Sequence, residues 1–186
     1  MGTVRRNTAG TVRLTTAMQE LAGLRTKVGW FDTARYEDGT AVAYVATIQE
    51  FGAPTQAIPA RPFMRPTIIE RQAEWKALMS SGSKAIAKGK RTALEVMTIL
   101  GLQAEGDVRL TISTLTEPAL SPLTIAVRAY MKEQGTPLGK LKGRRELGKV
   151  AKLLEQNKID VSGVSTKPLV FSSLMLATLT SVVEKT

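Results

Sequence analysis

The chain has 186 residues and a formal net charge of +10, and it contains no cysteine and no histidine. This composition excludes disulfides, thiolate or imidazole catalysis and zinc sites of the usual kind. No apolar run reaches the roughly 18 residues of a membrane-spanning helix, so we expect no membrane partner. The excess of Lys and Arg fits either an anionic partner or solubility alone.

The N-terminal part of the chain predicts two helices and a strand. Residues 1–13 lack periodicity and are expected to be a flexible arm. Apolar residues then recur at helical spacing over 14–24, with Gly23 as a stop signal. Residues 25–31 have strand propensity, and a turn follows them. The alanine-rich segment 41–51 predicts a short helix that ends at Gly52.

The middle of the chain combines a proline-rich segment with two helices. Four prolines between residues 49 and 68 exclude a continuous helix or a central strand there. Pro66 is expected to be the first residue of a helix that presents Ile68 and Trp75 on its apolar face. We expect the segment SSGSKAIAKGK (80–90) to interrupt that helix.

The segment 91–113 has the longest apolar pattern and predicts a long central helix. Its apolar stripe has 3-4-3-4 spacing and consists of Leu94, Met97, Gly101, Ala104 and Val108. Gly101 and Ala104 would allow a neighbouring element to approach closely.

The C-terminal part predicts two further helices and a strand. Ser121 is a candidate N-cap, with Pro122 at the first helical position. A basic, glycine-rich loop at 135–149 leads to a short helix at 146–157, and a strand is expected at 178–184. The fold class is therefore α+β, with a small mixed or antiparallel sheet packed against several helices, including one long central helix. A single domain should cover 14–186, with a basic loop and helix inserted at about 135–158.

No catalytic or cofactor pattern withstands a direct test. Ser81 and Lys84 satisfy S-x-x-K, but the companion motifs of that enzyme class are missing. The segment GSKAIAKGKR (82–91) lacks the spacing of a phosphate-binding loop, and Arg91 stands where Ser or Thr would bind magnesium. Glu37 and Asp38 are adjacent in a turn, a poor arrangement for acid–base chemistry. We expect no enzymatic activity, cofactor or metal.

A basic segment near residue 140 is the candidate contact for DNA or an acidic partner. It could bind phosphates without reading bases, and the alternative is a solvated flexible surface. The candidate residues are Lys140, Lys142, Arg144 and Arg145.

A long, irregular motif consists of QEFG at 49–52 followed by IPARPFMRP at 58–66, and VGWFD at 28–32 precedes it. These segments resemble a family of tailed-bacteriophage neck proteins, known as head–tail joining, tail-completion or virion morphogenesis proteins. LSPLTIAVR (120–128) is similar to a helix start of that family. KPLVFSSLMLATL (167–179) is similar to its C-terminal segment, but Phe171, Ser172 and Ser173 replace Asp-Thr-Gly and Met175 replaces a leucine.

The resemblance implies a structural virion protein rather than an enzyme. Members of the family form a ring, usually a hexamer, at the junction of head and tail. They assemble in the host cytoplasm and contact head-completion or connector proteins and tail-terminator or tail-tube proteins, with genomic DNA passing through the channel. The second hypothesis for the function is a tail-terminator ring, and the third is a sequence-nonspecific DNA-binding protein.

The proline-rich motif is the candidate interface. Prolines stiffen a segment before docking, and aromatic and arginine side chains are common energetic centres of interfaces. The candidate residues are Glu50, Phe51, Gly52, Pro59, Arg61, Pro62, Phe63, Arg65 and Pro66. The alternative is that Phe51 and Phe63 are core residues and that the two arginines pair with local carboxylates.

Overall fold

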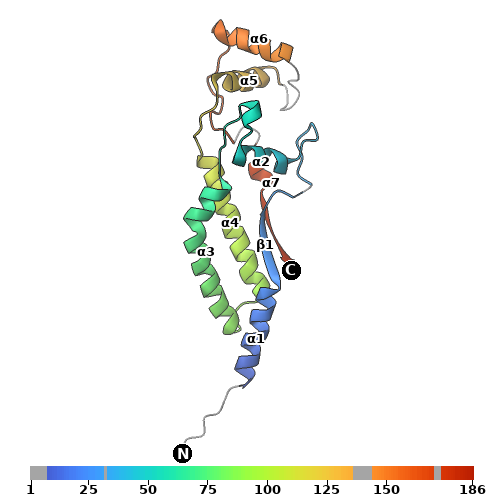
Figure 1. Cartoon of the computed structure of the whole chain (residues 1–186), viewed down its shortest axis with the longest axis vertical. Coiled ribbons are helices and arrows are strands. Elements are labelled where there is room, and N and C mark those ends of the chain that lie inside the picture. Colours follow the sequence, from blue (N-terminus) through green and yellow to red (C-terminus); the bar gives the residue numbers. More distant parts are fainter. Residues whose placement is uncertain (1–7, 32, 136–143, 170–172) are drawn as a thin grey trace, which may run out of the picture. The chain divides into compact units, whose positions relative to one another are not determined.

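The computed structural model describes residues 8–31, 33–135, 144–169 and 173–186. The described residues form an α+β fold of helices and one two-stranded antiparallel sheet, as predicted (Figure 1). Its elements are α1 (Thr8–Ala22), β1 (Leu24–Gly29), α2 (Val42–Phe51), a 3₁₀ turn η1 (Pro54–Gln56), α3 (Met64–Ala87), α4 (Ala93–Thr114), α5 (Pro122–Glu133), α6 (Arg144–Glu155), α7 (Leu174–Thr178) and β2 (Thr180–Lys185).

The chain groups into two compact units, where the sequence predicted one domain over 14–186. The first unit comprises Met1–Gly29, Pro66–Val108 and Thr180–Thr186. The second comprises Trp30–Arg65 and Arg109–Leu179. The chain passes from one unit to the other within α3 and again within α4.

The first unit is built from the sheet, α1 and most of α3 and α4. β1 pairs with β2 from Leu24 opposite Lys185 to Gly29 opposite Thr180, and the sheet lies beside α4 (Figure 1). A Cβ at Gly101 of α4 would lie 2.9 Å from Cγ2 of Thr26 and 3.0 Å from Cβ of Ser181, one on each strand. The close approach predicted at Gly101 is therefore confirmed.

The predicted apolar stripe of α4 is mostly buried. Met97, Ala104 and Val108 are buried, whereas Leu94 is 55% exposed. Val96, which lies beside this stripe on α4, is 2% exposed and packs with Ile86 of α3. The periodicity therefore predicted the helix correctly and most of its buried face.

Two predictions about α3 are wrong, and a third is confirmed only in part. The helix begins at Met64 rather than Pro66, because a side chain from α2 accepts its first backbone N–H groups. It also continues through the expected break at 80–90 as far as Ala87. Of the predicted apolar face, Ile68 is 49% exposed, whereas Trp75 is half-buried, so this prediction is confirmed in part. Gly82 does not break the helix, because it gives close contact with Val96, and a Cβ at this position would overlap the valine.

The expected N-terminal arm is partly helical. α1 begins at Thr8, so only residues 1–7 of the predicted arm lie outside the described residues. The stop at Gly23 is confirmed, and its N–H donates to the carbonyls of Gln19 and Glu20. β1 ends at Gly29 rather than at residue 31.

The second unit contains α2, α5, α6 and α7. The Ser121 cap is confirmed, since its Oγ accepts the N–H of Thr124 at 3.2 Å and Pro122 is the first residue of α5. α6 packs against α5, with Val150 fully buried. α6 confirms the helix predicted at 146–157 but begins at Arg144, so residues 144–149 are helical rather than part of a loop.

Candidate functional site

The motif at 49–66 folds into a tight hairpin after α2. Gly52 ends α2 with φ +76°, and a Cβ there would lie 2.8 Å from the backbone nitrogen of Ala60. Ala53 and Ile58 then exchange backbone hydrogen bonds of 2.9 and 3.1 Å around η1. The N–H of Arg61 donates to the carbonyl of Gln49 at 2.6 Å, so the chain returns to the last turn of α2. Glycine at 52 is therefore required by both conformation and space.

Glu50 is the centre of this motif. Its side chain is buried, and Oε2 accepts the backbone N–H groups of Phe63 and Met64 at 2.7 and 2.9 Å. Oε1 accepts the N–H of Arg65 at 3.2 Å and its Nε at 2.9 Å. The first N–H groups of a helix have no partner within the helix. Glu50 therefore caps α3 from another helix, with a negative charge at the positive end of its dipole.

The electrostatics of Glu50 favour the carboxylate form. Burial on its own would raise the pKa, but the N–H groups of Met64 and Phe63 and the guanidinium of Arg65 lower it below the usual value. The group is thus charged at neutral pH.

Arg65 contacts both the side chain and the backbone of Glu50. Besides pairing with the carboxylate, its Nη2 donates to the backbone carbonyl of Glu50 at 2.9 Å. Its guanidinium carbon lies 4.9 Å from the centroid of the Phe51 ring, in a cation–π contact. Phe51 is 62% exposed, so this ring and guanidinium face solvent.

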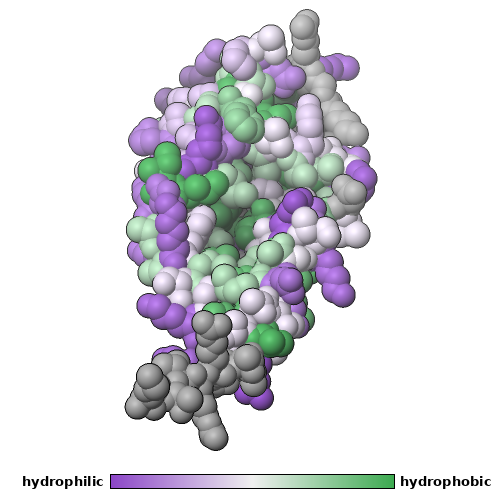
Figure 2. Space-filling model, turned by 60° about the horizontal axis from the view of Figure 1, so that its bottom comes forward, coloured by the Kyte–Doolittle hydropathy of each residue, from purple (hydrophilic) through white to green (hydrophobic). Residues whose placement is uncertain are grey.

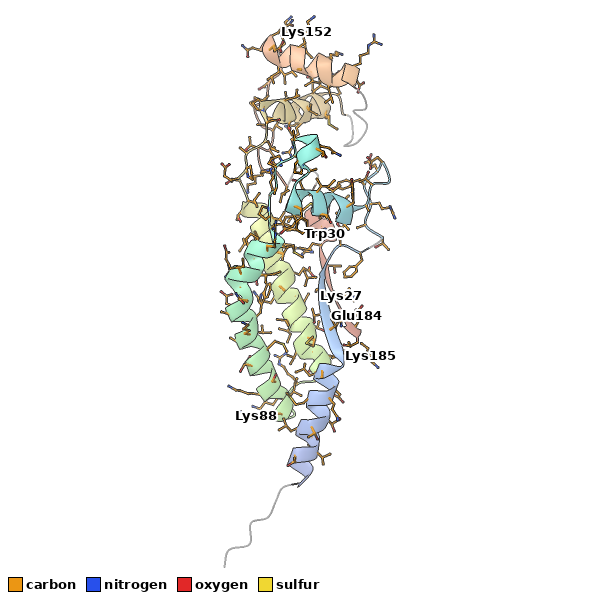
Figure 3. All side chains as sticks on the ribbon, viewed as in Figure 1. Lys27, Trp30, Lys88, Lys152, Glu184 and Lys185 are labelled. Carbon is orange, nitrogen blue, oxygen red and sulfur yellow. The ribbon has the colours of Figure 1, made fainter. Side chains whose placement is uncertain are left out.

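Phe63 is a core residue. It is 1% exposed, and its ring meets that of Trp30 edge-on at a centroid distance of 5.6 Å. Nε1 of Trp30 donates to the carbonyl of Met175 at 2.8 Å (Trp30 is labelled in Figure 3). For Phe63 the core alternative is therefore correct, whereas Phe51 is exposed.

Two buried arginines bind backbone carbonyls. Nε and Nη2 of Arg61 donate to the carbonyls of Pro118 and Ala119 at 2.8 and 3.1 Å. The alternative that Arg61 pairs with a local carboxylate is wrong. Arg128, which is 8% exposed, donates to the carbonyls of Ser165, Lys167 and Pro168 at 2.8 to 3.0 Å. Burial lowers the pKa of both arginines, and the charge of Arg61 further lowers the pKa of Arg128.

These contacts join the segments that carry the family resemblance. Arg61 of the proline-rich motif holds the carbonyls just before LSPLTIAVR. Arg128, the last residue of LSPLTIAVR, holds the carbonyls around Lys167 and Pro168 in the C-terminal segment. Trp30 of VGWFD reaches Met175 in that same segment. The sequence did not identify Arg128 as a site residue. The available signal was a single arginine among the apolar residues of the helix predicted after Ser121.

The remaining motif residues are less buried. Pro59 is exposed, and Pro62 and Pro66 are half-buried. Of the nine candidate interface residues, Phe51, Pro59 and Arg65 are therefore the exposed ones.

Half of the basic candidate residues lie outside the described residues. Lys140 and Lys142 are not among them, Arg144 begins α6, and Arg145 is exposed. Glu146 and Glu155 occur on the same helix, so its described part carries both signs of charge. Nζ of Lys149 lies 3.2 Å from the Tyr130 hydroxyl, where its charge is engaged with α5.

Within the described part of the chain, no group of three or more acidic residues is placed to hold a metal ion. None of the described helices combines the length and the apolar character needed to cross a membrane.

A scan against protein-family models and searches of curated proteins and of solved structures found no match to this chain.

Proposed function

We propose that the chain is a structural subunit of a tailed-phage neck, which assembles into a ring at the head–tail junction. The resemblance favours a hexamer that completes the neck or tail so that head and tail can join. It operates without catalysis or cofactor, by presenting surfaces to its own copies and to the adjoining rings.

One observation carries the proposal. Four segments with family resemblance, far apart in the sequence, are linked by the hydrogen bonds of Arg61, Arg128 and Trp30. Such linkage is expected if the resemblance reflects a shared fold, since chance matches would have no reason to meet. It supports the motif as a structural determinant, with Phe51 and Arg65 as its surface.

Exposed apolar side chains support an assembly role. Tyr44 and Phe51 in the second unit are 59% and 62% exposed, and Ile69 and Leu102 in the first are 69% and 58% exposed. Figure 2 shows hydrophobic residues at the surface among hydrophilic ones. Apolar groups of this kind favour protein–protein contact. The two strands also leave one edge each without a strand partner among the described residues, and open edges favour pairing.

Phe51 is the interface residue to test. Light scattering should give the mass of a closed ring for the wild-type protein and a smaller species for Phe51→Ala, because a ring needs matching heterologous surfaces. Leu147→Ala is the matched control, since Leu147 is also exposed but lies on α6, outside the motif. A monomeric wild-type protein would contradict the ring, and a Phe51→Ala ring of unchanged mass would contradict the interface.

The tail-terminator role is the second candidate. It would use the same surfaces and differs in the neighbouring ring that is contacted.

A further inference from the structure

The connection between α3 and α4 is an exposed segment of one charge sign. Between Glu74 and Glu95 the chain has no carboxylate and five basic residues. Four of these occur within residues 84–91 and are exposed: Lys84, Lys88, Lys90 and Arg91. Figure 3 shows Lys88 at the end of α3. We call this segment, residues 84–91, the basic hairpin.

The basic hairpin has a defined backbone. After Ala87 the chain turns through Gly89 with φ +68°, and the N–H of Lys90 donates to the carbonyl of Ala85 at 2.9 Å. Thr92 and Glu95 then form a capping box at the start of α4, with hydrogen bonds of 2.8 and 3.2 Å. The turn thus holds the cations on a fixed backbone.

The nearest acidic residue in sequence is already engaged. The carboxylate of Glu95 accepts the backbone N–H of Thr92, and this hydrogen bond, that with the Thr92 hydroxyl and the nearby charge of Arg91 lower its pKa. None of the four cations of the basic hairpin has an ion pair within the described residues. Their charges are available to a partner.

α1 supports the basic hairpin and adds a fifth cation. Ala17 and Leu21 pack against a buried cluster that includes Ile86 and Ala93, the residues that flank the connection. Arg13 is four positions before Ala17, so it lies on the same side of α1, one turn further along, and it is exposed.

Helix stability does not account for all of these charges. Cations near the C-terminus of α3 interact favourably with its dipole, which explains Lys84 and Lys88. Lys90 and Arg91 instead precede the N-terminus of α4, where the dipole disfavours positive charge. The helix dipoles therefore do not account for Lys90 and Arg91, and binding of an anion would give these two cations a role.

We propose that the basic hairpin, together with Arg13, binds the phosphate backbone of double-stranded DNA without reading its sequence. Lys88 directly follows α3, and its N–H donates to the carbonyl of Lys84 at 3.2 Å, so these two cations lie one turn apart and can contact phosphates together. The segment 84–91 has no aromatic side chain that could stack on bases, which argues against single-stranded nucleic acid. It also has no exposed large apolar side chain to insert into a lipid surface. This proposal does not depend on the neck function.

The experiment is a salt titration of binding to a short, labelled DNA duplex of mixed sequence. Each phosphate contact contributes about −0.9 to the slope of log K against log salt, so a variant lacking four contacts should lose about 3.6 from that slope. The test variant is Lys84→Gln, Lys88→Gln, Lys90→Gln and Arg91→Gln combined. We expect weak binding with a shallow slope for it and steep salt dependence for the wild-type protein.

The matched control removes the same charge elsewhere. Its exposed substitutions are Lys76→Gln, Lys152→Gln, Lys158→Gln and Lys185→Gln. Both variants fall from +10 to +6, so an effect of net charge alone would change them equally. An equal loss of DNA binding in both variants would overturn the proposal. Anionic lipid vesicles serve as a second probe, and wild-type binding to the vesicles alone, or to neither the DNA nor the vesicles, would overturn it as well. A variant with Gln at residues 140, 142, 144 and 145 together tests the other basic candidate surface. A loss of DNA binding confined to that variant would also overturn the proposal.

Discussion

Removing the carboxylate of Glu50 should destabilise the second unit more than any neighbouring surface change. In Glu50→Ala, three backbone N–H groups at the start of α3 lose their acceptor. That of Phe63 is buried and has little access to water. An unsatisfied buried donor costs about 1–3 kcal/mol and a lost cap about 1 kcal/mol, which gives about 3 kcal/mol in total.

Glu50→Gln separates charge from hydrogen bonding. The amide keeps one acceptor oxygen but places an NH₂ group where the second oxygen receives N–H donors, and it removes the charge that Arg65 pairs with. We expect about half the loss of Glu50→Ala, or about 1–2 kcal/mol.

The assay is urea unfolding followed by tryptophan fluorescence. Trp30 packs on Phe63 and so reports on this region. A shared Trp75→Phe background leaves Trp30 as the sole tryptophan, since the chain has two. Glu70→Ala is the matched control, because Glu70 is exposed on α3 and its removal should change the free energy of unfolding by less than about 0.5 kcal/mol. If Glu50→Ala matched that control, the capping argument would be refuted.

Three further predictions concern pH and two pairs of glycines. Since the folded-state pKa of Glu50 lies below its ordinary value of 4.5, its contribution to stability is present above that pH and is lost as the pH falls through the folded pKa. The difference in unfolding free energy between wild type and Glu50→Gln should therefore shrink in acid, and a constant difference down to acid unfolding would contradict this. Gly52→Ala should cost at least about 1 kcal/mol more than Gly39→Ala in urea unfolding, since both have positive φ but a Cβ at Gly39 meets nothing within 4 Å. A Cβ at Gly106 also meets nothing within 4 Å, so Gly106→Ala should stabilise the protein by up to about 1 kcal/mol and raise its thermal midpoint, whereas Gly101→Ala should lower the midpoint. The opposite order would mean that the sheet does not pack on α4 at Gly101.

Local patterns predicted most of the elements. Periodicity and stop signals placed α1, α2 and α4, because those helices depend on local spacing and on glycines such as Gly23 and Gly52. A break was predicted at 80–90 because serine and glycine have low helix propensity. The prediction was wrong because close contact between Gly82 and Val96 decides the structure there. Propensity alone contains no information about that partner.

The candidate site was predictable as a motif but not as a set of contacts. The proline-rich segment was identified from its composition and resemblance, yet the cap that Glu50 provides depends on a turn of the chain at Gly52. The partners of Arg61 lie 57 and 58 residues further along the chain. A sequence pattern contains no signal for such pairs of arginine and backbone carbonyl, because any residue supplies the carbonyl.

If the proposed neck function is right, a phage encodes this chain, and the most direct test is electron microscopy of that phage's particles with the gene deleted and then restored. The proposal predicts free filled or empty heads and separate tails in the deletion mutant, and joined virions after complementation. Intact virions in the deletion mutant would contradict the proposed role at the head–tail junction.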